Sequence, residues 1–476
     1  MSSLPASDSE KIDSLISRTP SDFLLGVATS SWQIEGSSTT RGRCIWDDFS
    51  EVPGNILDGA LSDPACDHIN RWESDLDLLS WFGVDSYRFS VSWPRVLPTG
   101  EGAIDAKGLG FYDKLIDGLL ERNIKPSLTI YHWDLPSALQ SKGGWNWDGI
   151  DDVFAQYTEV LARKFADRVP SWSTFNEPWC IAFLGYADKV MAPGKSDAAA
   201  GLEAAYRILT SHARSLEVLR QHKVKEAGIV LNLTTYIPED DGAIPAARHM
   251  DGIMNRIWLD PLAGRGFPED IVKATQSFTD WSFVDETKLT KVSAPLDWLG
   301  INYYTPTRLA SVPDKNGRGP ANGARPDAFP GIPPIYFVPR LPVTTMGWEI
   351  HPESLTTTLK TTQERLPGVP MYITENGGAF PDEMINGAIS DHDRIDYYEG
   401  HLSAILDAKE SGVDVRGYYA WSFLDNLEWA EGWSKRFGLV HVDPETQLRT
   451  PKLSAYFYRE LLARLKRKRT SPTISA

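Results

Sequence analysis

Residues 171–178 read SWSTFNEP and place a glutamate at the end of a predicted strand. Trp172 and Phe175 favour extended backbone, so we expect a half-buried strand to lead up to Glu177. Pro178 ends that strand, because proline has no N–H group to donate to a neighbouring strand. Glu177 is therefore expected at the lip of a strand, where burial of a carboxyl group is costly unless the group has a partner or a function.

Segments of the same kind recur along the whole chain and alternate with amphipathic stretches. The eight predicted strands span 23–30, 85–93, 125–133, 171–178, 227–234, 297–304, 370–377 and 413–423. The amphipathic stretches carry apolar residues spaced as in helices, such as Leu115, Leu119 and Leu120, and Ile395, Tyr398, Leu402 and Ile405. Eight strand–helix units without a glycine-rich dinucleotide motif predict an α/β fold, a single closed (β/α)8 TIM barrel.

Residues 1–476 show no break in composition, so we expect one barrel domain with two distinct ends and one long insertion. Residues 1–20 are predicted to form a polar arm. The basic residues of 464–476 are predicted to form a solvated helix end, which the composition favours over the alternative of a localisation signal in RLKRKRT (464–470). Residues 305–346 are rich in proline and glycine and show little periodicity. Because they follow the sixth strand, we expect this long loop on the catalytic face of the barrel.

Composition restricts the partners and the location of the protein. A net charge of −16 argues against a nucleic acid or an anionic membrane as partner, and no run of 18 apolar residues exists to span a bilayer. The N-terminus lacks the apolar core of a secretory signal, which predicts a cytoplasmic protein. Three cysteines without CxxC spacing support neither a disulfide framework nor a zinc site. The sequence does not decide the oligomeric state, and a homodimer is left open.

Polar side chains gather at the ends of the predicted strands. The chain has 17 tryptophans, a surplus that suits a site stacking flat ligands such as sugar rings, although large aromatic residues also fill large cores. In a TIM barrel the active site lies at the carboxyl ends of the strands. The residues near those ends are Gln33, Arg88, His132, Asn176, Glu177, Asn232, Asn302, Tyr304, Glu375 and Trp421.

The second glutamate of this set, Glu375, lies in YITENG at the end of the seventh strand. Strands four and seven of an eight-stranded barrel lie almost opposite each other. Two carboxyl groups that face each other across a cleft are what glycosidic bond cleavage requires, one as the acid and one as the nucleophile or base. The sequence therefore predicts a glycoside-cleaving site between Glu177 and Glu375.

These motifs resemble those of glycoside hydrolase family 1, which includes intracellular β-glucosidases, and we expect the fungal type of these enzymes. TFNEP and ITENG match the acid/base and nucleophile signatures, and further matches cover nearly the whole chain: FLLGVATSSWQIEG (23–36), YRFSVSWPRVLPTG (87–100), YHWDLP (131–136), GINYY (300–304) and WSFLDNLEWAEGWSKRFGL (421–439). One departure is Cys44, which stands where relatives usually have serine and which we do not expect to affect the chemistry.

The resemblance implies a retaining two-step mechanism without metal or cofactor. Glu375 would be the nucleophile and Glu177 the acid/base, with the two carboxyl groups about 5–5.5 Å apart. It also implies that Arg88, Asn302 and Tyr304 complete the catalytic set. The residues implied to bind the sugar or the aglycone are Gln33, His132, Asn176, Asn232, Trp421, Glu428, Trp429 and Phe437, with Trp179, Leu184 and Trp348 at the aglycone entrance.

The implied substrate is a small, unphosphorylated β-glucoside, because Glu428 would repel the phosphate of a 6-phospho-sugar. Galactose or fucose at the non-reducing end is an open alternative, and a transglycosidase would keep all of these residues. A sugar-binding pseudoenzyme would lack one of the two glutamates, and a metal-dependent hydrolase would need a His/Asp cluster such as HxH, which the sequence lacks.

Overall fold

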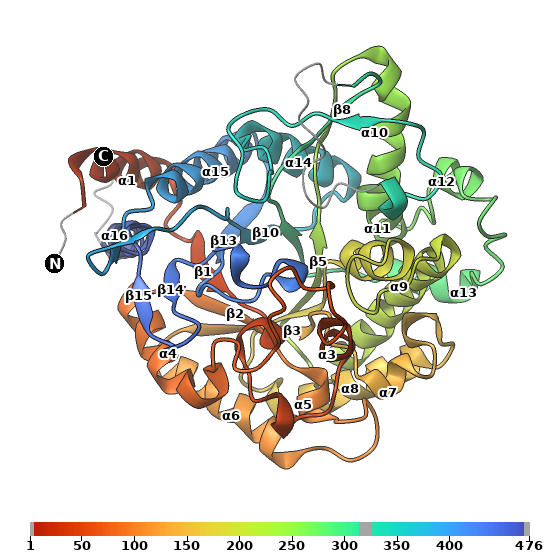
Figure 1. Ribbon diagram of the computed structural model, residues 1–476, viewed down its shortest axis with the longest axis horizontal. Coiled ribbons are helices and arrows are strands. Elements are labelled where there is room, and N and C mark those ends of the chain that lie inside the picture. The colour runs from red at the N-terminus through yellow and green to blue at the C-terminus, as the bar shows by residue number, and fades with distance from the viewer. Residues whose placement is uncertain (1–3, 314–325, 471–476) are drawn as a thin grey trace.

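The computed structural model describes residues 4–313 and 326–470, and its centre is a closed barrel of eight parallel strands surrounded by helices (Figure 1). Around the barrel the strands follow the order β1-β13-β10-β7-β5-β4-β3-β2. Their bounds are β1 Leu24–Ala28, β2 Ser86–Ser90, β3 Lys125–Tyr131, β4 Ser171–Asn176, β5 Glu226–Asn232, β7 Trp298–Asn302, β10 Met371–Asn376 and β13 Val415–Trp421. Each lies within or overlaps a predicted segment, so the barrel prediction is confirmed.

The strands are buried almost throughout, because helices cover the outside of the barrel and side chains fill its inside. The main helices are α4 His68–Phe82, α6 Ala106–Glu121, α8 Ile150–Phe165, α9 Ala198–Gln221, α14 Pro352–Arg365 and α15 His392–Glu410. The shorter ones are α2 Ser31–Ile34, α3 Ile45–Ser50, α5 Trp93–Val96, α7 Ser137–Gln140, α10 Ile244–Asp251, α11 Ile257–Leu262, α12 Glu269–Ala274 and α13 Glu286–Leu289. After β4 the chain forms a π-helical segment, η3 (Cys180–Ala187).

The predicted helical faces are largely confirmed. Leu115 and Leu119 of α6 are buried, as are all four apolar residues named in the stretch that forms α15. Leu120 is the exception, with 39% of its surface exposed. It follows Leu119 directly and is therefore rotated by about 100° from the inward face of the helix.

The strand register aligns polar residues at one rim of the barrel. Asn302 of β7 pairs with Asn232 of β5 on one side and with Glu375 of β10 on the other. Strand β4 has an irregular register with β5 between Ser173 and Asn176. The neighbouring strands β5, β7 and β10 therefore present two amide groups, of Asn232 and Asn302, and the carboxyl group of Glu375 at the same level of the barrel.

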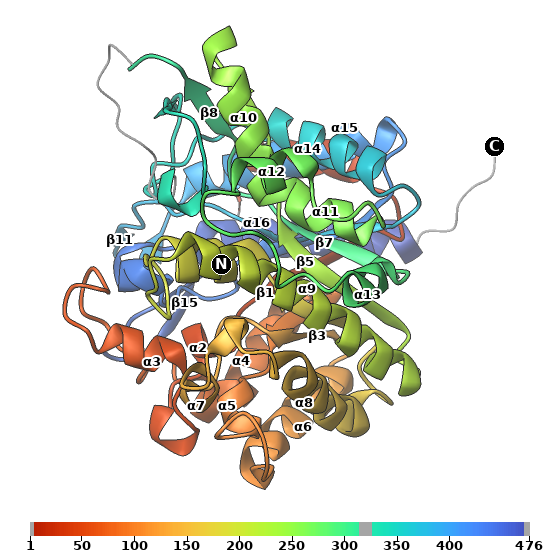
Figure 2. The same ribbon diagram turned by 90° about the vertical axis from the view of Figure 1, so that its right-hand side faces the viewer.

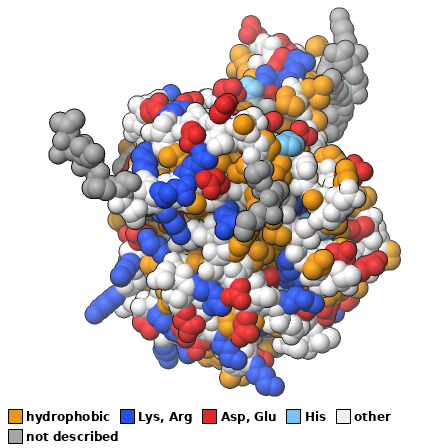
Figure 3. Space-filling view, turned by 90° about the vertical axis from the view of Figure 1, so that its left-hand side faces the viewer, with side chains coloured by type: hydrophobic (Ala, Val, Ile, Leu, Met, Phe, Trp, Pro, Cys, Tyr) orange, Lys and Arg blue, Asp and Glu red, His pale blue; other side chains and the backbone are white. Residues whose placement is uncertain are grey.

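The N-terminal segment, expected to be a polar arm, is an amphipathic helix, α1 (Ala6–Arg18). Its residues Ile12 and Leu15 are buried, because a spacing of three puts them on one face, which packs against α15 and α16 (Leu453–Thr470). Figure 1 shows α1 and α16 together at one side of the barrel. Nearby side chains on that side of the molecule mix positive, negative and apolar types (Figure 3).

The basic end of α16 is bound to the protein and is not a free solvated tail. Lys468 Nζ donates to the carbonyl oxygens of Ile16 at 2.7 Å and Thr19 at 2.8 Å, and Arg469 pairs with Asp85 at 2.6 Å. The last carbonyl groups of a helix lack partners within the helix, so cations stabilise the C-terminal end of α1. Residues 471–476 of the predicted tail lie outside the described residues.

The described parts of the long insertion, 305–313 and 326–346, contain regular structure that the sequence did not predict. Strands β8 (Thr307–Ala310) and β9 (Tyr336–Phe337) form a sheet with β6 (Tyr236–Pro238) beside α10 (Figure 2). The pairing of β6 with β8 joins two distant segments, so local periodicity does not reveal it. The remaining strands form two hairpins, β11 Met384–Ile385 with β12 Ala388–Ile389 and β14 Val440–Val442 with β15 Arg449–Pro451. Among the residues described, no helix is long and apolar enough to cross a membrane.

Candidate active site

The two glutamates singled out by the sequence both lie at the rim and are almost fully buried. Glu375 belongs to β10 and is 3% exposed, and Glu177 follows β4 directly and is 6% exposed. The backbone of Glu177 has φ of +48°, in the left-handed region that residues with a side chain rarely occupy. Such a conformation persists only where the surrounding structure enforces it, and it is frequent at functional sites.

Glu375 is held by two strong donors. Arg88 Nη1 donates to its Oε1 at 2.6 Å, and the Tyr304 hydroxyl donates to its Oε2 at 2.6 Å. Burial raises the pKa of Glu375, and the guanidinium and the phenol act in the opposite direction because both favour the charged form. With a buried cation in direct contact, Glu375 is the carboxyl group of the pair that carries the negative charge.

Glu177 has weaker, uncharged partners. Asn302 Nδ2 donates to its Oε1 at 2.7 Å, and the thiol of Cys180 lies 3.2 Å from its Oε2. Burial, followed by the negative charge of Glu375, raises the pKa of Glu177 to about 8. The surroundings therefore favour the proton on Glu177 and the negative charge on Glu375, which is the division of states that an acid and a nucleophile need.

A chain of amides connects the two glutamates. Asn176 Oδ1 accepts from Arg88 Nη2 at 2.6 Å and from Asn302 Nδ2 at 3.0 Å. Two donors to the same atom fix the orientation of the Asn176 amide, so its Nδ2 donates to His132 Nε2 at 3.0 Å. His132 then carries its proton on Nδ1, and burial together with the charge of Arg88 keeps its pKa well below the usual range.

Two polar atoms of the predicted sugar-binding set are buried without a partner among the described residues, Nδ1 of His132 and Oε2 of Glu428. Desolvation, with the charges of Glu375 and Glu177, raises the pKa of Glu428 to about 8, although the side chain as a whole is partly exposed. Buried polar groups in native proteins normally have a hydrogen-bond partner. A ligand with several hydroxyl groups would supply the missing partners.

Trp429 lies in a cluster of aromatic rings. Its ring centroid is 4.3 Å from that of Trp133, 4.6 Å from Trp46 and 5.5 Å from Trp32, and its φ is +48°. His132 lies against it and against Trp421, with ring centroids 5.8 and 6.0 Å apart. This cluster fixes the residue next to Glu428.

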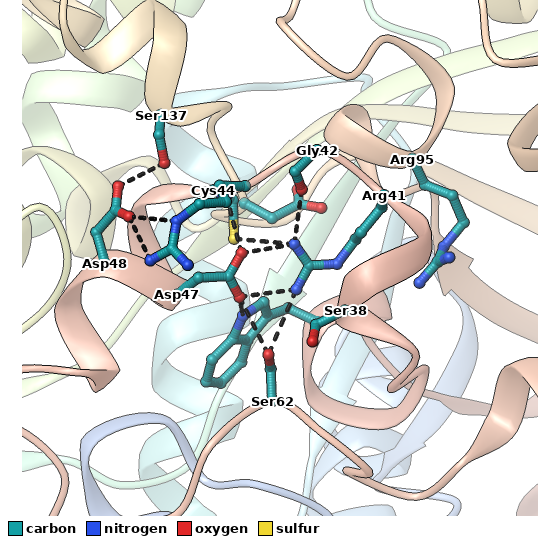
Figure 4. Close-up of polar contacts among 12 residues, drawn as sticks. Ser38, Arg41, Gly42, Cys44, Asp47, Asp48, Ser62, Arg95 and Ser137 are labelled. Atoms are coloured by element: carbon teal, nitrogen blue, oxygen red, sulfur yellow. Dashed lines mark hydrogen bonds and ion pairs between the residues drawn. The ribbon is translucent and has the colours of Figure 1, made fainter.

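The helix that carries Trp46 is anchored by a buried ion pair. Arg41 binds both carboxylate oxygens of Asp47, at 2.6 and 2.8 Å, and Asp47 also accepts from Trp32 Nε1 at 3.1 Å. Figure 4 shows the Arg41 guanidinium facing Asp47, with Cys44 beside it. Cys44 begins α3 as its N-cap residue, and its backbone N–H donates to Asp47 at 2.9 Å.

The remaining predicted residues surround this centre in different roles. Gln33 Nε2 donates to the Leu427 carbonyl oxygen at 2.7 Å and so holds the loop that carries Glu428. Trp348 contacts Tyr304 and Phe437, with ring centroids 5.4 and 6.0 Å apart. Trp421 and Phe437 belong to one small buried cluster.

Two of the three residues predicted at the aglycone entrance, Trp179 and Leu184, lie directly before η3 or on it, whereas Trp348 lies between β9 and α14. Leu184 is buried in η3, and Trp179, just before it, packs on Phe329 at 5.3 Å. Phe329 belongs to the insertion 305–346, which therefore reaches the carboxyl-end rim, as predicted. Asn232 donates to the sulfur of Cys180 at 3.5 Å, a contact within the protein that the sequence did not predict.

Two residues that sequence reasoning missed contact the catalytic set. Cys180 touches Glu177, and Thr374 Oγ1 donates to Asn302 Oδ1 at 2.7 Å. Both lie within three positions of a glutamate, which is the signal that could have found them. Within the described residues, no group of three or more His, Cys, Asp and Glu side chains is arranged to hold a metal ion.

A TIM barrel with two buried glutamates at the carboxyl ends of β4 and β10, one bound by a cation and one desolvated beside it, is typical of a glycoside hydrolase. A sequence model described as Glycosyl hydrolase family 1 matches residues 16–467. The chain belongs to this family, which confirms the resemblance found in the motifs.

The chain is similar to several bacterial enzymes over nearly its whole length. It is 42% identical to Beta-glucosidase A of Thermotoga maritima, covering 93% of this chain and 97% of that protein. It is 40% identical to the bifunctional beta-D-glucosidase/beta-D-fucosidase of Bifidobacterium breve, covering 93% and 98%. The solved structure of the T. maritima β-glucosidase in complex with glucoimidazole is similar to this chain with a TM-score of 0.86 at 42% identity, covering 94% of this chain and 99% of that chain. These bacterial relatives do not support the expected fungal type.

Proposed function

We propose that this protein is a retaining β-glucosidase that removes terminal non-reducing β-D-glucosyl residues from cellobiose, short cello-oligosaccharides and aryl or alkyl β-glucosides. The observation that carries the proposal is the asymmetric environment of the two glutamates. Arg88 and Tyr304 bind Glu375, whereas Glu177 is desolvated next to a negative charge. The similarity to enzymes named β-glucosidases supports the choice of sugar.

In the first step Glu375 attacks the anomeric carbon and forms a covalent glycosyl-enzyme. Glu177 transfers its proton to the glycosidic oxygen as the bond to the leaving group breaks. The hydrogen bonds from Arg88 and Tyr304 orient Glu375 for the attack and keep it charged beforehand. Neither this step nor the later hydrolysis of the glycosyl-enzyme requires a metal or a cofactor.

In the second step Glu177 acts as the base. Esterification removes the negative charge of Glu375, and with it the repulsion that holds the proton on Glu177. The pKa of Glu177 then falls, so the carboxylate can take a proton from the water that attacks the anomeric carbon. Glu375 leaves as a carboxylate, and the sugar keeps its β configuration.

The sugar is proposed to occupy the space bounded by the tryptophan cluster and the two glutamates. The unpartnered atoms of His132 and Glu428 would bind hydroxyl groups, and Trp421 would stack on the ring. Asn176, oriented by Arg88 and Asn302, would bind the 2-hydroxyl. The remaining residues proposed to line the sugar and aglycone positions are Gln33, Asn232, Trp429, Phe437, Trp348 and Trp179.

A broader β-glycosidase is the second candidate, and the similarity to the bifunctional glucosidase/fucosidase favours it. The test is to measure kcat/KM for aryl β-glucoside, aryl β-fucoside, aryl β-galactoside, cellobiose and a 6-phospho-β-glucoside. We expect hydrolysis of the glucoside and cellobiose and very low activity on the phosphorylated sugar. Preferred hydrolysis of the 6-phospho-glucoside would contradict the assignment of Glu428. Adding an alcohol and analysing the products would reveal transglycosylation.

A further inference from the structure

We propose that the thiol of Cys180, itself held by Asn232, is a positioning residue that donates a hydrogen bond to Oε2 of Glu177 and orients this carboxyl group for both steps of the reaction. The inference rests on the proposed role of Glu177 as the acid/base. It adds to that role a side chain with no part in the expected catalytic or sugar-binding set.

The geometry places the thiol between two polar groups. Cys180 Sγ lies 3.2 Å from Glu177 Oε2, and Asn232 Nδ2 lies 3.5 Å from the same sulfur. The amide of Asn232 can only donate through Nδ2, so the sulfur accepts there. The S–H group is then available for the carboxyl oxygen of Glu177. The two oxygens of Glu177 thus have separate partners, Asn302 on Oε1 and Cys180 on Oε2.

The backbone reinforces this arrangement. The Cys180 N–H donates to the Glu177 carbonyl oxygen at 3.0 Å, and Cys180 is the first residue of η3. Glu177 itself has its backbone in the left-handed region, so its side chain direction depends on such local contacts. Cys180 also lines a small cavity with apolar neighbours such as Trp133, Ile181 and Met191. The thiol therefore lies between an apolar space and the acid/base.

The chemistry of the thiol fits a donor. Burial raises the pKa of Cys180 well above its usual range, so the group keeps its proton at the pH of the reaction. A hydrogen bond donated to a carboxyl group favours the ionised form, which is the form that Glu177 needs as a base. Other charged or titratable groups act on Glu177 from other elements: Glu375, Glu428, Arg88 and Tyr304. All four remain in place when only Cys180 is changed.

The test compares Cys180→Ala, which removes the donor, with Cys180→Ser, which keeps one. The first measurement is the alkaline limb of the pH profile of kcat/KM for an aryl β-glucoside, which reports loss of the proton of Glu177. We expect Cys180→Ala to move this limb upward by about 0.3 to 1 pH unit, the equivalent of one weak hydrogen bond. Cys180→Ser should restore at least half of the shift.

The second measurement isolates Glu177 as a base. The enzyme is trapped with a 2-deoxy-2-fluoro-β-glucoside, and hydrolysis of the stable glycosyl-enzyme is followed over time. We expect this reactivation to be slower by roughly 3- to 10-fold in Cys180→Ala and faster again in Cys180→Ser. Asn232→Ala, which leaves the thiol in place but removes its second partner, should show a smaller change in the same direction. It provides a second test if Cys180→Ala does not fold.

The matched controls are Cys44→Ala and Cys44→Ser, the same changes at another buried cysteine. Both should have the wild-type pH profile and reactivation rate. An unchanged alkaline limb and reactivation rate in Cys180→Ala, with normal glucosidase activity in the wild type, would overturn this inference alone. If the wild type did not hydrolyse β-glucosides, or if Glu177→Gln hydrolysed cellobiose normally, the proposed function would fail as well.

Discussion

Arg88 Nη1 lies 2.6 Å from Oε1 of Glu375, and these two side chains, 287 positions apart in the chain, are both almost fully buried. A buried ion pair of this kind leaves an uncompensated charge when one partner is removed. Here the uncompensated charge would be the nucleophile itself. The pair therefore links the stability of the barrel rim to the ionisation of Glu375.

Replacing Arg88 with methionine should move the acid limb of the pH profile. Arg88 lowers the pKa of Glu375, so its removal raises that pKa, and Glu375 then loses its charge at a higher pH. We expect the acid limb of kcat/KM to shift upward by at least about 1 pH unit, and kcat/KM at its optimum to fall by about 100-fold or more. Arg88→Lys, which keeps the charge, should shift the limb less. An acid limb at the wild-type position in Arg88→Met would show that another group sets it.

The two glutamates should respond differently to the same substitution. Glu375→Gln removes the nucleophile, so every glycoside should lose activity by about 10⁴-fold or more, whatever its leaving group. Glu177→Gln removes only proton transfer, which a dinitrophenolate leaving group hardly needs. With a dinitrophenyl glucoside this variant should release a burst of dinitrophenol and then turn over slowly, because the intermediate accumulates. Cellobiose should be nearly inert.

Azide provides the control for Glu177→Gln, because it attacks the glycosyl-enzyme without a base. We expect azide to restore turnover of the dinitrophenyl glucoside and to give β-glucosyl azide. Formation of the α-azide would contradict a covalent intermediate in which Glu375 is bound to the α face of the sugar. Azide should not rescue Glu375→Gln in the same way.

The stereochemistry of the first product tests the two-step mechanism. Two carboxyl groups about 5–5.5 Å apart act by double displacement, which retains the configuration. NMR spectra recorded early in the hydrolysis of an aryl β-glucoside should therefore show β-glucose before mutarotation produces the α-anomer. Early accumulation of α-glucose would indicate direct attack by water and a wider separation.

Glu428 should determine how well the sugar is bound. We expect Glu428→Ser to lower kcat/KM for an aryl glucoside by about 10- to 1000-fold, because the shorter side chain no longer reaches the 4- and 6-hydroxyls. Activity on an aryl β-fucoside, which lacks the 6-hydroxyl, should fall less. Equal losses on both substrates would show that Glu428 does not discriminate at the 6-position.

Glu428 should also reduce stability at high pH. Its pKa is about 8 in the folded protein and about 4.3 in an unfolded chain. Between these values the unfolded state binds fewer protons, so the free energy of unfolding falls as the pH rises from about 4 to 8. Glu428→Gln removes this titration. The free energy of unfolding of the variant minus that of the wild type should therefore be larger at pH 8 than at pH 5, by about 1 to 3 kcal/mol. Partial exposure of Glu428 keeps the effect below that of a fully buried group.

Denaturant unfolding at pH 5 and pH 8 measures this difference. Glu399→Gln is the matched control, since it makes the same chemical change at a partly exposed position on α15, away from Glu428. Its difference from the wild type should change less between the two pH values than that of Glu428→Gln. An equal difference at the two pH values for Glu428→Gln would contradict the raised pKa of Glu428.

The sequence alone was sufficient for the barrel and for the two glutamates. Strands such as 171–178 and 370–377 were recognisable because each combines an apolar run with a local stop signal, and both signals lie within a few residues. The carboxyl ends of parallel strands meet at one rim, so Glu177 and Glu375 could be placed together without coordinates. Residues such as Arg88 and Asn302 followed from their positions near strand ends and from the family resemblance.

Only the tertiary structure decided which of these side chains touch. The contact between Asn232 and Cys180 joins residues 52 positions apart on different elements, and Lys468 meets the end of α1 across 449 positions or more. Likewise, Thr307 of β8 pairs with Tyr236 of β6, 71 positions away in the chain. Periodicity and capping are local properties that each segment carries by itself. Contacts between segments, and the pKa values that depend on them, arise from packing, which is why the contact between Asn232 and the thiol of Cys180 could be recognised only in the folded protein.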